Sequence, residues 1–71
     1  MNKQDLIESL KAKRLLCYQK HNDAYKEWKK YDEAYGPGDI LTRLAAEKME
    51  AENARIDEIN DFIETLDSLE A

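Results

Sequence analysis

The chain has one cysteine, one histidine, one proline and two glycines among its 71 residues. A single cysteine excludes a disulfide within the chain, and one histidine beside it cannot complete a structural zinc site. No apolar run approaches the length of a membrane-spanning helix, and no signal-peptide pattern is visible. We therefore expect a soluble, cytoplasmic protein without metal or cofactor, in which packing alone has to provide stability.

The residues that interrupt helices are gathered in one place. Gly36, Pro37 and Gly38 adjoin each other near the middle of the chain. Glycine tolerates the left-handed conformation that ends a helix, and proline cannot continue one. The sequence predicts a single helical-hairpin domain over 1–71, with a helix over 3–35, a turn over 36–38 and a helix over 39–69. Asn2 and Asp39 are the expected N-caps.

Charge is abundant and unevenly distributed. Charged residues make up 38% of the chain and hydrophobic residues 42%, with a net charge of −5. Residues 1–35 carry eight Lys and Arg against six Asp and Glu, whereas residues 36–71 carry three against ten. Helical spacing of the apolar residues argues against disorder. A mildly basic helix is thus expected to lie against a strongly acidic one.

Each predicted helix has an apolar face. A rotation of 100° per residue gathers one set on the first helix: Leu6, Ile7, Leu10, Cys17, His21, Ala24, Tyr25, Trp28, Tyr31 and Tyr35. On the second helix the set is Leu41, Leu44, Ala45, Met49, Ile56, Ile59, Phe62, Ile63, Leu66 and Leu69. If the chain turns back at Pro37, these faces meet with opposite polarity. The predicted fold is all-α, an antiparallel two-helix hairpin of coiled-coil type.

The apolar surface exceeds what one partner helix covers. The face of the second helix is wider than a two-helix contact, and Leu15 and Leu16 lie off the main face of the first. A chain this short rarely buries enough apolar area to be stable alone. We expect self-association, as a homodimer forming a four-helix bundle. The alternative is a monomeric hairpin that covers this surface on meeting another protein.

Polar residues interrupt the middle of the predicted contact. They are Arg14, His21, Lys48, Glu52 and Arg55. One interpretation is a pocket in which Glu52 and His21 transfer protons; the other is a hydrogen-bonded layer that fixes register. We favour the second, and the first stays open. Cys17 and His21 share a face but have no further ligand or base within reach, so no catalytic residue and no enzymatic activity is expected.

Acidic residues follow the side of the second helix opposite its apolar face. They are Asp39, Glu47, Glu50, Asp57, Glu58, Asp61 and Glu64. Such a side can simply face water, or it can dock on a basic surface, including one made for DNA or RNA. The sequence favours a small protein-binding module, whether adaptor, assembly factor or inhibitor. Its candidate contacts are acidic at Glu50, Asp57, Asp61 and Glu64, and apolar at Leu15, Leu16 and Phe62.

The alternative function is nucleic-acid binding by the first helix of a dimer. Five of the six aromatic residues lie within residues 18–35, interleaved with Lys20, Lys26, Lys29 and Lys30. Aromatic rings stack on bases and lysines neutralise phosphates. Most of these rings are predicted to point along the helix contact and the lysines elsewhere, which makes this the weaker interpretation.

Overall fold

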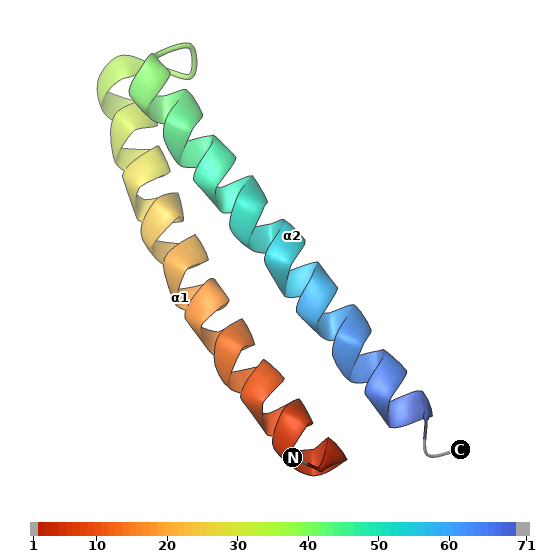
Figure 1. The fold of residues 1–71 in the computed structure, drawn as a ribbon. Helices are drawn as coiled ribbons and strands as arrows, with labels where there is room; N and C mark the ends of the chain where they lie inside the picture. Colours follow the sequence, from red (N-terminus) through yellow and green to blue (C-terminus); the bar gives the residue numbers. More distant parts are fainter. Residues whose placement is uncertain (1, 70–71) are drawn as a thin grey trace.

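Two long helices lie side by side and run in opposite directions. The computed structural model describes residues 2–69, which form α1 (Lys3–Tyr35) and α2 (Ile40–Ser68). Figure 1 shows the turn at one end of the rod, and the start of α1 with the end of α2 at the other. The rod measures 51 × 16 × 13 Å along its principal axes. The predicted all-helical hairpin is confirmed.

Both helices begin at the predicted caps. The Asn2 side chain accepts a hydrogen bond from the Asp5 amide at 2.9 Å, and the Asp39 side chain accepts one from the Leu41 amide at 2.9 Å. Each cap satisfies an amide that has no carbonyl partner within its helix. Because Asp39 has extended backbone (φ −70°, ψ 146°), α2 begins at Ile40, one residue later than predicted.

The turn depends on Gly36. Its φ of 87° lies in a region that residues with a side chain rarely adopt. The Gly36 amide donates to the Asp32 carbonyl at 2.9 Å, closing the end of α1. The Gly36 carbonyl in turn accepts a hydrogen bond from the Thr42 hydroxyl at 2.9 Å. This hydrogen bond connects the first turn of α2 to Gly36, the residue before Pro37.

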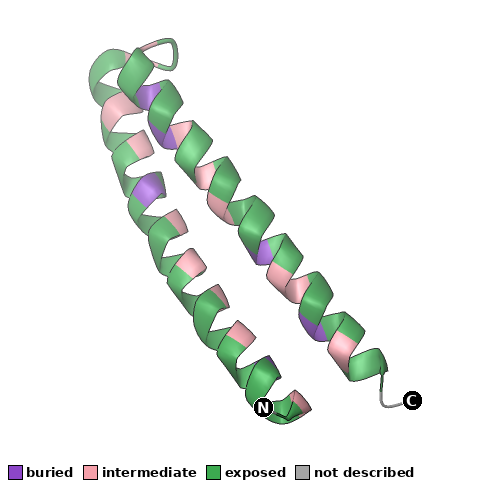
Figure 2. Cartoon of the chain, viewed as in Figure 1, coloured by how far each residue is buried: buried purple, intermediate pink, exposed green. Residues whose placement is uncertain are grey.

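Buried positions form one narrow seam between the helices. Along α1 and α2 they alternate in steps of three and four residues, the pattern of a two-helix coiled-coil contact. The seam residues of α1 are Lys3, Ile7, Leu10, Arg14, Cys17, His21, Ala24, Trp28 and Tyr31, and those of α2 are Thr42, Ala45, Met49, Glu52, Ile56, Ile59, Ile63 and Leu66. Figure 2 shows these buried and half-buried positions on the facing sides of the two ribbons.

The seam is narrower than the predicted apolar faces. Seven residues assigned to those faces are exposed beside it: Leu6, Tyr25, Tyr35, Leu41, Leu44, Phe62 and Leu69. A single partner helix covers only a stripe, so residues one position away from it remain in water. Conversely, the polar Thr42 is the most deeply buried residue, at 1% exposure, because its hydroxyl has a partner in Gly36.

Two polar contacts define the register. The Arg14 guanidinium donates to the Asn60 side-chain oxygen at 2.7 Å, and the Lys48 ammonium lies 3.7 Å from the Glu27 carboxylate. They are consistent with the expected return of the chain at Pro37. Tyr31 meets the start of α2 as predicted, whereas Tyr35 lies outside and stacks on Tyr31 with ring centroids 6.4 Å apart.

Candidate functional site

The predicted polar layer is only partly inside the seam. Arg14, His21 and Glu52 are half-buried, as expected, but Lys48 and Arg55 are exposed at its rim. Lys48 pairs with Glu27 across the helices, and Arg55 lies 3.4 Å from Glu52 one turn away. The prediction that Lys48 and Arg55 lie inside the seam is wrong, because long cationic side chains extend to water from positions beside a helix contact.

Glu52 has the least satisfied side chain of this layer. Its side chain is 12% exposed, and one carboxylate oxygen meets Arg55. The other oxygen is buried and has no hydrogen-bond partner among the described residues. Such an atom weakens the seam locally.

Cys17 faces this carboxylate. Burial raises the pKa of the Cys17 thiol, and the nearby Glu52 charge raises it further. The thiol therefore stays protonated near neutral pH, and a protonated thiol is a poor nucleophile and metal ligand. Among residues 2–69 no group of three or more His, Cys, Asp or Glu side chains is placed to hold a metal ion.

Shallow hollows follow one long side of the hairpin. From the turn towards the open end, neighbouring hollows share Lys48 and Ala51, then Lys20 and Arg55, then Glu58. The first three therefore form one continuous groove between the helices, and the last extends it onto α2 alone. We call it the grooved side. Besides further residues of the seam, it is lined by Lys13, Leu16, Lys20, Asp23, Glu27 and Tyr31 of α1 and by Leu41, Leu44, Glu47, Lys48, Ala51, Arg55, Glu58, Asp61, Phe62 and Thr65 of α2.

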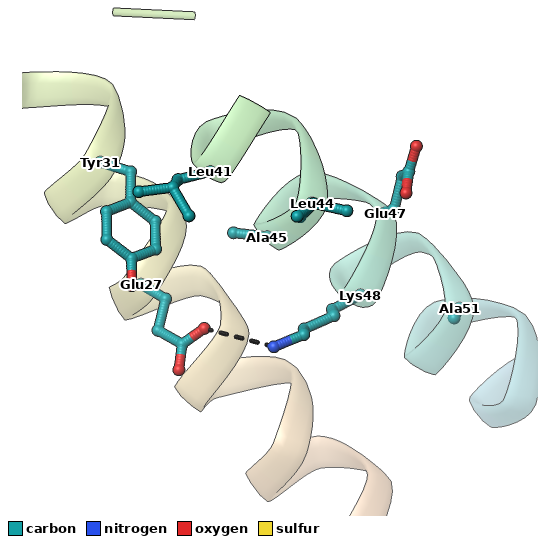
Figure 3. Close-up of a pocket in the computed structure, with 8 residues that line it drawn as sticks. All are labelled: Glu27, Tyr31, Leu41, Leu44, Ala45, Glu47, Lys48 and Ala51. Carbon is teal, nitrogen blue, oxygen red and sulfur yellow. Dashed lines mark ion pairs between the residues drawn. The ribbon is translucent and has the colours of Figure 1, made fainter. Parts of the chain in front are cut away.

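The groove is apolar towards its two ends and charged in the middle. Figure 3 shows its turn-end section, where Tyr31 of α1 and Leu41 and Leu44 of α2 line the hollow above the Glu27–Lys48 ion pair. Towards the open end, Leu16 is 57% exposed and Phe62 63% exposed. Both border hollows that include Glu58, so the structure places these two predicted apolar contacts on one side.

Leu15 lies apart from them. It is 58% exposed and lines none of the hollows described here, whereas its neighbour Leu16 lines the groove. Consecutive helical residues point 100° apart, which turns Leu15 away from the groove that Leu16 borders. The three predicted apolar contacts are therefore divided between two surfaces.

The predicted acidic contacts are all exposed on α2. We call Glu50, Asp57, Asp61 and Glu64 the acidic side. Within residues 2–69, none of their carboxylates takes part in an ion pair or a side-chain hydrogen bond. At 1.5 Å per residue they extend over about 21 Å of helix. This is a rigid row of uncompensated negative charge.

The aromatic residues of α1 are not all in the seam. Tyr25 is exposed and borders a shallow hollow on α1 with Lys26, Lys29 and Lys30. Its ring contacts Trp28, with centroids 6.0 Å apart. The prediction that most of these rings point along the helix contact is wrong, because Tyr18, Tyr25 and Tyr35 are exposed and only Trp28 and Tyr31 lie in the seam. Tyr25 lies one position outside the three-four pattern of the seam, on the side of the lysines.

Sequence reasoning overlooked Asn60, which lies half-buried beside the seam and accepts the hydrogen bond of Arg14. This polar side chain follows Ile59 and was not assigned to the apolar face. A search for polar residues level with Arg14 in the hairpin register could have found it, because an inward-facing guanidinium needs an acceptor.

Neither helix in the described part of the chain is long and apolar enough to cross a membrane. Comparison with protein-family models, with curated proteins and with solved structures finds no match for this chain.

Proposed function

We propose that the protein is a small non-enzymatic binding module whose acidic side docks on a basic surface of another protein. The observation that carries the proposal is the set of unpaired carboxylates at Glu50, Asp57, Asp61 and Glu64. Of the three cations on α2, Lys48 and Arg55 have acidic partners within the hairpin, and Arg43 is exposed seven residues before Glu50. The charge that is left over on this helix is therefore negative and concentrated on its outer side.

A rigid row of one charge sign affects association in two ways. It accelerates encounter with a surface of opposite charge, and it fixes the orientation in which the two surfaces meet. Salt screens exposed charges beyond about 8–10 Å, so binding of this kind weakens as salt rises. Because α2 is held straight by α1, its carboxylates have a constant spacing before any partner binds. Binding therefore costs little conformational entropy.

Paired charge reversals test the proposal. Asp57→Lys/Asp61→Lys removes the centre of the acidic side, and Glu8→Lys/Glu33→Lys changes the net charge equally from exposed positions on α1. Each tagged variant is used to capture proteins from nuclease-treated lysate, followed by washes of rising salt. We expect a stoichiometric partner to be retained by the wild type and the α1 variant and lost by the α2 variant. Equal retention by both variants would remove the acidic side from the proposal.

A second candidate function is nucleic-acid binding by α1. It is favoured by the exposed Tyr25 ring beside Lys26, Lys29 and Lys30, an arrangement that offers stacking together with phosphate neutralisation. The chain's net charge of −5 opposes it.

Binding of a labelled single-stranded oligonucleotide at low salt tests this candidate. Binding should fall in Lys26→Ala/Lys29→Ala and persist in Lys11→Ala/Lys13→Ala, which removes the same charge elsewhere on α1. If no complex forms at low salt, this candidate is excluded.

A further inference from the structure

The hairpin leaves large apolar side chains on its grooved side. Leu41 and Leu44 are exposed towards the turn, and Leu16 and Phe62 towards the open end. Leu41, Leu44 and Leu16 border hollows that both helices line, and Phe62 borders the adjoining hollow on α2. Exposed apolar residues aligned along both helices of one face are typical of a surface that another helical unit covers.

Charged residues in the middle of the groove lie at two levels along the rod. The Arg14–Asn60 and Glu27–Lys48 contacts set the register, which places Lys20 level with Arg55. These two cations border the same two hollows. Glu27 lies seven residues from Lys20 on the same helix, about 10.5 Å towards the turn. Lys20 and Arg55 thus lie at one level, with Glu52 beside Arg55 and Asp23 in the same hollow, and the Glu27–Lys48 ion pair lies at the next.

Small residues separate these two levels. Ala24 and Ala51 both border the central hollow and are level with each other in the hairpin register. Alanine allows helices to approach closely, so this is the place where a second pair of helices can come nearest.

We propose that the grooved side is covered by a second copy of this chain, lying antiparallel to the first about a two-fold axis at the level of Ala24 and Ala51. This rotation places Glu27 over Lys20 of the second copy. It also places Leu41 over Phe62 of the second copy, and Tyr31 over Leu16 of the second copy. These matches hold within about one residue step, 1.5 Å. Each contact occurs twice, as in any two-fold interface.

Charge favours this arrangement over the other face-to-face one. A two-fold axis along the rod would keep both turns at one end and bring Lys20 and Arg55 of both copies to a single level. Four cations would then meet there, with Glu52 already paired with Arg55 and Asp23 as the other carboxylate of the central hollow, so Lys20 would gain further cations as neighbours but no carboxylate of the second copy beyond these. In the antiparallel arrangement the Lys20 and Arg55 residues of the two copies lie at different levels, and Glu27 of the other copy lies over each Lys20.

The size of the surface is sufficient. A stable interface buries roughly 800 Å² per partner. One long side of this rod, 51 Å by 16 Å, has about that area. The resulting four-helix bundle leaves Glu50, Asp57 and Glu64 outside and has Asp61 at its edge, so dimerisation and the proposed partner binding use surfaces that meet only at Asp61 and can fail separately.

Charge exchange combined with sedimentation equilibrium tests the arrangement. Lys20→Glu should weaken the dimer about tenfold, since the new carboxylate meets Glu27 of the second copy twice per dimer. Lys20→Glu/Glu27→Lys should return the dissociation constant to within about threefold of the wild type. The two positions are too far apart to pair within one helix, so recovery has to come across the interface. Lys29→Glu, outside the groove, is the matched control, and circular dichroism checks that each variant stays helical.

Cross-linking locates the axis. In a Cys17→Ser background, Ala51→Cys should be joined to its symmetry mate by a short bis-maleimide, whereas Asp57→Cys on the acidic side should not. A chain that stays monomeric at high micromolar concentration would overturn the proposal. A dimer that neither recovers in the double variant nor cross-links through residue 51 would overturn it equally.

Discussion

The two halves of the hairpin pack by different means. In the half next to the turn, residues 21–54, large rings of α1 such as Trp28 and Tyr31 are opposed by small residues of α2, with Thr42 and Ala45 the most buried. In the open half, residues 2–20 and 55–69, branched or long aliphatic side chains come from both helices, as at Ile7 and Ile63. One half relies on complementary sizes and a hydrogen-bonded turn, the other on aliphatic area together with the Arg14–Asn60 hydrogen bond.

The difference shows where the chain tolerates change. A seam of large rings over small residues has no room for added volume, because alanine already marks the limit of approach. A seam of aliphatic residues from both sides adjusts to exchanges that keep the volume but suffers when volume is removed. The same hairpin is thus sensitive to enlargement near its turn and to truncation near its open end.

Truncation in the open half should have the largest effect. Ile56→Ala removes a side chain that is 6% exposed, and we expect the free energy of unfolding to fall by about 2–4 kcal/mol. Urea unfolding followed by circular dichroism measures the change. Ile56→Leu, which keeps the volume, should cost less than about 1.5 kcal/mol. Equal losses in both variants would mean that shape and not volume governs this half.

Enlargement in the turn half comes next. Ala45→Leu places three further carbon atoms where exposure is 2%, opposite the rings of α1, and should cost about 1–3 kcal/mol. Ala54→Leu adds the same volume at an exposed position of α2 and should change stability by less than about 0.5 kcal/mol. If Ala45→Leu is neutral, size complementarity does not describe the turn half.

Substitution of the two glycines tests how the backbone of the turn contributes to stability. Gly36→Ala forces a side chain into φ 87° and should destabilise by roughly 1–2 kcal/mol, although no atom lies within 4 Å of the added carbon. Gly38→Ala meets no neighbour and no left-handed backbone, so it should be neutral or stabilise by up to about 1 kcal/mol. Because neither position is crowded, a lower melting temperature for Gly36→Ala than for Gly38→Ala reports backbone strain at Gly36.

The smallest expected effect is a pH-dependent change in stability that comes from Cys17, where the two halves meet. Because the folded chain raises the pKa of Cys17 above its ordinary value of 9.0, folding favours the protonated thiol. This contribution is complete below pH 9 and is lost as pH rises through the folded pKa. The wild type should therefore lose more stability than Cys17→Ser between pH 8.5 and pH 10. Parallel stability curves for the two proteins over that range would contradict burial of the thiol beside Glu52.

Local signals in the sequence predicted much of this fold. The break at Gly36–Gly38, the caps at Asn2 and Asp39, and the antiparallel register follow from backbone preferences that act over a few residues. The acidic side was also visible, because exposed charge needs no tertiary partner to be recognised.

The exact course of the seam was harder to predict. A straight wheel of 100° per residue drifts by about 20° per heptad against a seam that repeats every 3.5 residues. Over 33 residues of α1 this drift carries Tyr35 onto the predicted face although it is exposed. At the start of α2 it likewise favours Leu41 over Thr42, whose burial depends on a hydrogen bond across the turn. Only the paired helices determine these positions.

The placement of Trp28 gives the two halves different optical signals. It is the only tryptophan of the chain, it is half-buried in the turn half, and Tyr25 lies close enough to transfer excitation to it. Its fluorescence therefore reports on residues near the turn, whereas far-ultraviolet circular dichroism averages over both helices. Coincident transitions in the two signals would show that the hairpin opens as one cooperative unit. An earlier loss of ellipticity would show the open half separating while the rings near the turn are still packed.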